Sequence, residues 1–117
     1  MEIHMTCIFC QIIQGEMPGD IVLQNEYITA FRDINPAAPK HILIVPNKHI
    51  ASTEDLHRHD SIIASELLLA VKDVSSLENI SQNGYRIISN CGSHGRQEVQ
   101  HLHIHVLGGA PMKYGLG

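Results

Sequence analysis

The sequence has few of the features that would place a protein in a membrane or on a nucleic acid. Its 117 residues include no tryptophan, and its longest apolar stretches, such as 42–46 and 67–71, fall far short of the roughly 20 residues that a membrane-spanning helix needs. Eight Lys and Arg stand against twelve Asp and Glu, for a formal charge of -4, and the basic residues are scattered. We therefore expect no membrane segment and no electrostatic binding of DNA or RNA.

Signs of secretion and of a second domain are also missing. Residues 1–6 do not form a basic segment followed by an apolar one, so we expect no secretory signal and, by default, a cytoplasmic protein. Three cysteines are an odd number, which argues against a disulfide framework. No linker, charge run or internal repeat divides the sequence, and we predict one domain over residues 1–117.

Short β-rich runs and one long amphipathic segment dominate the pattern. Apolar residues recur every three or four positions from about 61 to 77, which predicts a long helix. Thr6 can cap a short helix over 7–13, with Gly15 as its stop. The expected strands cover 21–23, 27–31, 41–45, 85–89 and 100–107. Together these elements predict an α+β domain in which an antiparallel five-stranded sheet carries one long and one short helix.

Histidine is the residue in excess. The chain contains nine, and in His101-Leu102-His103-Ile104-His105-Val106 polar and apolar residues alternate strictly. A strand would place the three imidazoles on one face and the apolar side chains in the core. Histidine can serve near neutral pH as nucleophile, base or, once protonated, donor to an anion. A solvated sheet face and a zinc or copper site made by the triplet are the other interpretations.

Cys7 and Cys10 form a second, separate signal. Two cysteines at this spacing are half of a tetrahedral zinc site, or simply two buried thiols.

The histidine triplet resembles the signature of the histidine triad family. The similarity covers nearly the whole chain, in the segments 7–13, 30–36, 41–46, 48–50, 90–92 and 107–109. The ending Leu107-Gly108-Gly109 is similar to the nucleoside phosphoramidase branch, the histidine triad nucleotide-binding proteins. The resemblance implies a histidine-triad-like fold, a homodimer and a purine nucleotide ligand. It implies a hydrolase that cleaves purine nucleoside phosphoramidates, or acyl- and aminoacyl-adenylates, at the α-phosphorus and releases the monophosphate.

The resemblance also implies catalytic roles, position by position. His103 matches the nucleophile, which forms a nucleotidyl-histidine that water then opens. His105 would donate to a phosphate oxygen, and His101 would orient the site. His41 would reach in from its own strand. Glu98 takes the place of a proton donor to the leaving group.

Substrate contacts are implied in the same way. Asn90 and the backbone of Val99 resemble phosphate contacts, Gln97 the residue beside the leaving group, and Asp33 the acceptor of the ribose hydroxyls. The slot for the base would consist of Ile8, Phe9, Ile12, Phe31, Ile34 and Leu43. Without the resemblance, Asp33 would be assigned to a turn cap and His41 to a hydrogen-bonded core position. The core would then be the assignment for Phe9, Ile12, Phe31, Ile34 and Leu43.

Two features bear on the details of the site. Arg96 stands where the family usually has a small residue; its guanidinium could favour an anion, narrow the entrance or demand a conformation suited to glycine. His49 and His101 resemble the other half of a zinc site with Cys7 and Cys10 in some bacterial members, which implies a structural zinc that also fixes the tautomer of His101.

Other functions stay open on the sequence. They are a dinucleoside polyphosphate hydrolase of the same superfamily, a non-catalytic nucleotide-binding adaptor and a metal-binding module. Nucleotidyl transfer is disfavoured, because the transferase branch usually has Gln where this chain has His105. The dimer would use the long helix and one edge strand.

Overall fold

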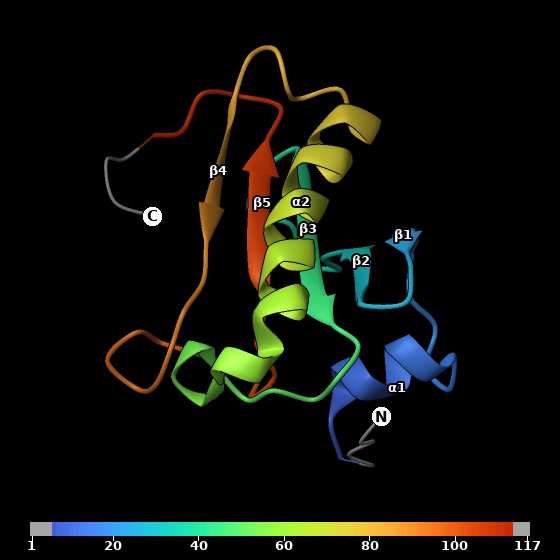
Figure 1. The fold of residues 1–117 in the computed structure, drawn as a ribbon. Helices are drawn as coiled ribbons and strands as arrows, with labels where there is room; N and C mark the ends of the chain where they lie inside the picture. Colours follow the sequence, from blue (N-terminus) through green and yellow to red (C-terminus); the bar gives the residue numbers. More distant parts are fainter. Residues whose placement is uncertain (1–5, 114–117) are drawn as a thin grey trace.

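The computed structural model describes residues 6–113 (Figure 1). Residues 1–5, most of the segment considered for a secretory signal, lie outside this range, as do residues 114–117. The elements in chain order are α1 (Ile8–Gln14), β1 (Ile21–Gln24), β2 (Ile28–Arg32), β3 (Lys40–Pro46), the short 3-10 helices η1 (Thr53–Asp55) and η2 (Arg58–Asp60), α2 (Ser61–Leu77), β4 (Tyr85–Ile88) and β5 (Ile104–Gly108).

The five strands form one antiparallel sheet in the order β1-β2-β3-β5-β4. With α1 and α2, the sheet confirms the predicted α+β class with one short and one long helix. Strand β3 lies at the centre, and Leu43 stands opposite His105 of β5. His105 of the triplet is therefore paired with the central strand.

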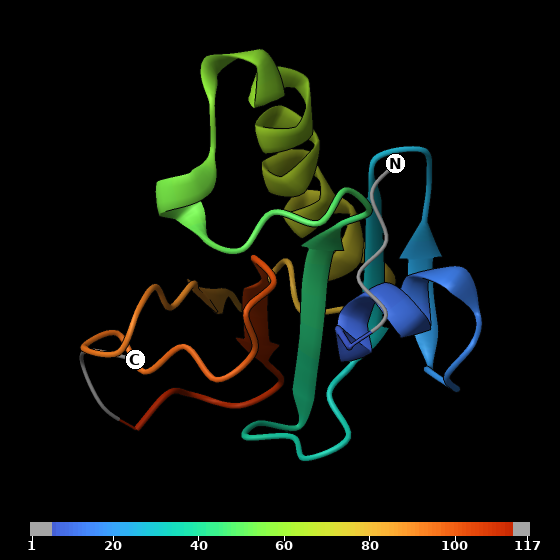
Figure 2. The same ribbon diagram turned by 90° about the horizontal axis from the view of Figure 1, so that it is seen from below.

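The two faces of the sheet carry different cores because successive side chains of a strand point to opposite sides. In β3, Ile42 and Ile44 belong to the core under α2, whereas Leu43 and Val45 pack with α1. Helix α2 packs on β1, β2, β3 and β5, and β4 lies next to β5 at the edge of the sheet (Figure 1). Figure 2 shows α1 on the side of the sheet away from α2.

Both predicted helices are present. Helix α2 covers 61–77 as expected and buries Leu67, Ala70, Val71 and Val74 at the helical spacing. Gly15 ends α1 with a φ of 78°, as predicted. The predicted cap of α1 is wrong, because Cys7 rather than Thr6 caps the helix, its sulfur accepting from the backbone N–H of Cys10. No helix among residues 6–113 is long and apolar enough to cross a bilayer.

The last strand differs from the prediction at its start. Strand β5 begins at Ile104 rather than at residue 100, so that of the three histidines only His105 lies on a strand. The backbone N–H of Leu102 donates to Ile50 at 2.7 Å, and the carbonyl of Pro46 is occupied by the His101 ring. These bonds replace the ladder with β3. The alternation of sides persists, because Leu102 is buried in the core under α2.

Candidate active site

A cavity of about 230 Å³ opens beside two of the three histidines. Its walls come from α1, the end of β2, the middle of β3, β5 with the residues before it, and the loop between β4 and β5. The lining residues are Phe9, Asp33, Leu43, Asn90, Arg96, Glu98, Val99, His103 and His105. Segments that lie far apart in the sequence thus meet at the place where β3 and β5 pair.

The ring of His103 has one nitrogen committed to the backbone. Its Nδ1 lies 2.7 Å from the carbonyl oxygen of His101. Because a carbonyl only accepts, Nδ1 carries the proton, and the neutral ring keeps its lone pair on Nε2. Phe9 packs edge-on at a centroid distance of 5.2 Å, and the hydroxyl of Ser89 donates to the carbonyl of His103. The orientation of the His103 ring is therefore fixed, and its Nε2 is available as a nucleophile.

A chain of hydrogen bonds sets the tautomer of His105. The backbone N–H of Ala37 donates to Nδ1 of His41 at 3.0 Å, so the proton of the neutral His41 ring sits on Nε2. That Nε2 lies 2.9 Å from Nδ1 of His105 and 3.5 Å from Oδ2 of Asp33. His105 accepts through Nδ1 and keeps its proton on Nε2. Of the two cavity histidines, His103 thus has a lone pair on Nε2 and His105 has a proton on Nε2. The centroids of the two rings lie 5.0 Å apart.

Burial keeps His41 and His105, the two histidines joined by a hydrogen bond, neutral. Burial, the largest cause, and the neighbouring rings of His103 and His41 together lower the pKa of His105 to about 4, against a smaller opposing effect of Asp33. Burial likewise lowers the pKa of His41, again opposed by Asp33. Near neutral pH, His105 is therefore a neutral hydrogen-bond donor rather than a cation.

The first histidine of the triplet, His101, is not among the residues that line the cavity. His101 is fully buried, and its Nε2 donates to the carbonyl of Pro46 at 2.9 Å. Its Nδ1 then carries the lone pair, 3.3 Å from Sγ of Cys7 and 3.6 Å from Sγ of Cys10. The three imidazoles lie on the side of α1, as expected, although only His105 is on a strand; two of them line the cavity and one joins the cysteines.

The geometry of this second cluster fits a tetrahedral metal. The ligand atoms of Cys7, Cys10, His49 and His101 all lie within 4.8 Å of one another. Nδ1 of His49 is 3.3 Å from Sγ of Cys10. Ligands bound to one zinc would have sulfur and nitrogen about 3.5 Å apart, close to these separations. No metal-type cluster within residues 6–113 contains all three histidines of the triplet, which argues against the triplet as a metal site.

Several predicted contacts do not line the cavity. Gln97 is buried in the loop between β4 and β5, where its Nε2 donates to the carbonyls of Ala51 and Val99 and its Oε1 accepts from the N–H of Gly92. Its amide therefore holds the loop together and does not face a leaving group.

The predicted base slot is also divided. Phe9 and Leu43 line the cavity, whereas Ile12 and Phe31 are buried in the core against α1. Ile8 and Ile34 are 41% and 88% exposed and are not among the cavity residues of the described chain.

Asp33 both caps a turn and lines the cavity, two roles that the sequence left as alternatives. Its Oδ1 accepts from the N–H of Asn35 at 2.8 Å, which caps a turn, while it also lines the cavity beside His41. Asn90 lines the cavity and donates to the carbonyl of Gly95 at 2.7 Å. Glu98 and Val99 lie in the wall as well.

The structure adds participants that sequence patterns do not reveal. The N–H of Ala37 and the carbonyl of Pro46 are backbone groups, which carry no sequence signal. Arg96, noted in the sequence only as a departure from the family pattern, lines the cavity and has a φ of 61°.

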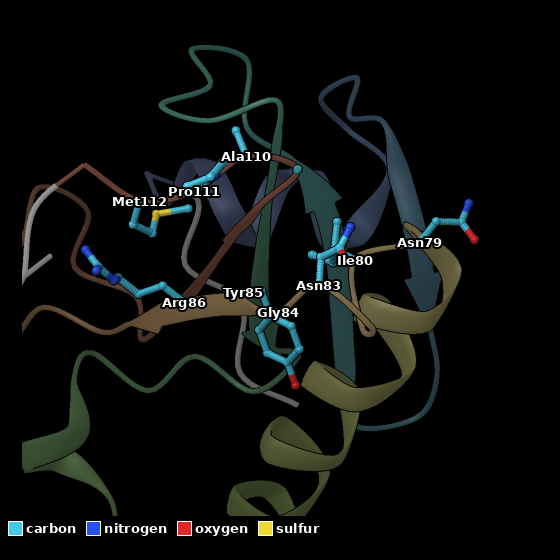
Figure 3. Close-up of a pocket in the computed structure, with 10 residues that line it drawn as sticks. Asn79, Ile80, Asn83, Gly84, Tyr85, Arg86, Ala110, Pro111 and Met112 are labelled. Carbon is cyan, nitrogen blue, oxygen red and sulfur yellow. The ribbon is translucent and has the colours of Figure 1, made fainter.

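A larger cavity, of about 600 Å³, lies away from the histidines. It lies between the end of α2, the start of β4 and the segment after β5, and its walls are Asn79, Ile80, Asn83, Gly84, Tyr85, Arg86, Gly109, Ala110, Pro111 and Met112. Figure 3 shows Arg86 and Met112 at one end of it and Asn79 at the other. Its walls contain no His, Cys, Asp or Glu from the described part of the chain, so the chemistry points to the smaller cavity.

Comparisons with known proteins agree with this geometry. The HIT domain family matches residues 14–112. The purine nucleoside phosphoramidase of Escherichia coli K12 is 46% identical over 106 residues, 90% of this chain and 88% of that protein. A HIT family hydrolase from Legionella pneumophila has a TM-score of 0.91 at 45% identity, covering 96% of this chain and 100% of that one. A histidine triad protein from Clostridium difficile has a TM-score of 0.93 at 41% identity, covering 99% and 100%.

Proposed function

The chain belongs to the HIT domain family, and on that premise we propose that it hydrolyses purine nucleoside phosphoramidates, or the related acyl- and aminoacyl-adenylates, at the α-phosphorus. The observation that carries this proposal is the complementary protonation of two rings in one cavity, with a lone pair on Nε2 of His103 and a proton on Nε2 of His105. The name of the Escherichia coli relative supports the choice of substrate class.

In the first step, Nε2 of His103 attacks the α-phosphorus, and the bond from phosphorus to the leaving nitrogen breaks. The ring becomes positively charged, and its Nδ1–H, already bonded to the carbonyl of His101, stabilises that charge. The departing nitrogen takes a proton, for which Glu98 in the cavity wall is our candidate donor. In the second step, water attacks phosphorus and gives its proton to the Glu98 carboxylate left by the first step, the bond from phosphorus to Nε2 of His103 breaks, and the nucleoside monophosphate leaves.

The remaining polar residues position the substrate. The N–H of His105 donates to a non-bridging phosphate oxygen, and His41 keeps that proton on the correct nitrogen. Asp33 retains acceptor lone pairs beyond its turn and its His41 contact, and we assign them to the ribose hydroxyls. Phe9 and Leu43 offer apolar surface to the base. The His101 ring orients His103 through its backbone carbonyl rather than by contact with phosphate.

Release of AMP from an adenosine 5'-phosphoramidate tests the assignment. Replacing His103 with Ala should lower kcat/KM by on the order of 1000-fold or more, because the nucleophile is lost. The exposed His94 offers a matched control, and His94→Ala should behave as wild type. Acid-quenched wild type should carry one nucleotidyl group on His103, detectable by mass spectrometry. Full turnover by the His103→Ala variant would overturn the assignment.

The same assay separates the competing functions. A non-catalytic adaptor would bind AMP without turning over any phosphoramidate. A dinucleoside polyphosphate hydrolase would prefer its own substrates when both classes compete in one reaction.

We also propose that Cys7, Cys10, His49 and His101 hold a structural zinc ion. The support is the fit of their four ligand atoms and the Nε2 bond from His101 to Pro46, which leaves Nδ1 available to a metal. Bound zinc would tie α1 to the sheet. Metal analysis after exhaustive dialysis should find one zinc per chain in wild type and none in the Cys7→Ser, Cys10→Ser variant; equal metal content in both would contradict the site.

A homodimer is the assembly that we propose. Strand β4 is an edge of the sheet, and its Tyr85 and Ile87 are exposed, as are Leu68 and Leu69 of α2. Pairing these surfaces would cover both the apolar side chains and the open edge. Sedimentation should give a dimer for wild type and a smaller species for Ile87→Lys; a monomeric wild type would refute this proposal. The odd number of cysteines suits a protein of the reducing cytoplasm, a location that fractionation would test.

A further inference from the structure

Arg96 is the single Lys or Arg among the cavity residues that the structure describes. Its backbone has a φ of 61°, a left-handed conformation that a residue with a Cβ adopts at a cost in free energy and that glycine adopts freely. Strain of this kind at a cavity wall is a reason to look for a function. The loop must hold the strained residue, because an unconstrained arginine would leave this conformation.

Hydrogen bonds within the loop keep Arg96 in place. Its backbone N–H donates to the carbonyl of Ser93 at 3.1 Å, and the N–H of Gln97 donates to the carbonyl of Gly92 at 3.0 Å. Gly95, just before it, has no room for a side chain, since a Cβ would lie 2.4 Å from a carbonyl oxygen. The side-chain amides of Asn90 and Gln97 add hydrogen bonds to the carbonyls of Gly95 and Ala51. Together these bonds fix the backbone of Arg96 at the cavity wall.

The charges of the other cavity residues suggest a function for the guanidinium of Arg96. Asp33 brings a carboxylate to the wall and His105 is neutral, so without Arg96 a second anionic group on a substrate would meet no Lys or Arg among the described cavity residues. Arg96 is exposed, and it forms no salt bridge within residues 6–113. A guanidinium offers a planar pair of donors that matches a carboxylate or phosphate.

From this we propose that Arg96 selects leaving groups that carry a negative charge, so that the preferred substrates are nucleoside phosphoramidates of amines bearing a carboxylate or a phosphate. Arg96 shares the loop and the cavity wall with Glu98, the candidate donor to the leaving nitrogen. The anion would therefore be held at the leaving-group side of phosphorus. This inference rests on the proposed hydrolase function and refines its substrate class.

The test compares substrates whose leaving amines differ in charge. Adenosine 5'-phosphoramidates of alanine and of alaninamide differ by one carboxylate, and that of phosphoethanolamine replaces it with a phosphate. Wild type should favour the alanine or the phosphoethanolamine compound over the alaninamide compound by at least about tenfold in kcat/KM, and the larger ratio identifies the anion. Arg96→Gln should bring both ratios down to about one, and Arg96→Lys should keep part of the preference. High salt should weaken the preference of wild type.

Matched variants separate this effect from net charge and from folding. Arg58→Gln, at an exposed arginine of η2 outside the cavity walls, removes the same charge and should keep the ratios of wild type. Arg96→Gly relieves the strained φ, so it should melt no lower than wild type while losing the preference. This pairing of equal or higher Tm with lost selectivity is not expected of a residue that only supports the loop.

Each other outcome counts against a stated claim. Equal kcat/KM for charged and neutral leaving groups in wild type would overturn the proposal for Arg96 and leave the hydrolase intact. An equal fall for both substrates in Arg96→Gln would also overturn it, because it would place the guanidinium on the α-phosphate. Failure of wild type to hydrolyse any of the three compounds would instead refute the proposed function.

Discussion

Acidification should destabilise the protein through His105 before its carboxylates are protonated. The pKa of this ring is about 4 in the folded protein, against an ordinary value of 6.5. The unfolded chain therefore binds more protons than the folded chain between these two values, so stability is highest above pH 6.5 and is lost as the pH falls toward 4. The pKa of His41 is lowered too, and its effect has the same sign.

The size of the effect follows from the shift. The interval from 6.5 to about 4 corresponds to roughly 3 kcal/mol as an upper value, because one pKa unit is about 1.4 kcal/mol and the ring is only partly buried. For a domain of this length we expect Tm to fall by about 10 °C or somewhat less between pH 7 and pH 4.5. The lowered pKa values of Asp60 and Glu78, caused by Lys48 and Arg32, cost stability only at pH values below about 4.5.

Urea denaturation between pH 7.5 and 5, with a chelator throughout so that loss of metal does not contribute, measures the slope. His105→Gln should lose distinctly less stability over this range than wild type, while His94→Gln, at an exposed histidine, should follow wild type. NMR titration of the His105 ring gives its pKa directly. A value near 6.5, or the same pH slope in wild type and His105→Gln, would refute the reasoning.

Three further predictions concern packing and the loop. Leu67→Ala should lower the free energy of unfolding by about 2–5 kcal/mol because its side chain is buried, whereas Leu77→Ala, 54% exposed and outside the proposed dimer surface, should change it little, as urea denaturation would show. Gly95→Ala should lower kcat/KM and Tm together, since the added Cβ would lie 2.4 Å from a carbonyl oxygen and displace the loop; wild-type values would contradict this. Glu78→Gln should cost about 1–3 kcal/mol at pH 7, because it weakens the charged pair of the buried Glu78 with Arg32, and the cost should shrink below pH 4.

Local periodicity was enough to predict most of the architecture. The spacing of apolar residues identified α2 over 61–77, and the β-rich runs identified all five strands to within a few residues. These signals predict helices and strands well because each element buries one face, and the residues of that face recur at a fixed spacing along one stretch of sequence. The resemblance to the histidine triad family placed His103, His105, Asp33 and Asn90 in one site before any fold was known, and the structure brings these residues to one cavity.

Other properties of the site depend on groups that are distant in sequence. Strand β5 begins later than its alternating pattern suggested, because the carbonyls of Pro46 and Ile50 bond to His101 and Leu102. Gln97 faces the loop rather than the cavity because backbone groups there satisfy its amide.

The sequence by itself determined which residue types are available and which elements carry them. Only the tertiary structure decided how each imidazole is used. His101 turns to the cysteines, His103 presents a lone pair and His105 presents a proton, since a backbone carbonyl beside His101 and beside His103, and the His41 ring beside His105, select the nitrogen that holds hydrogen. The carbonyl of Pro46 is 55 residues from His101 in the chain and the His41 ring is 64 residues from His105, and burial lowers the pKa of His105 so that its ring stays neutral.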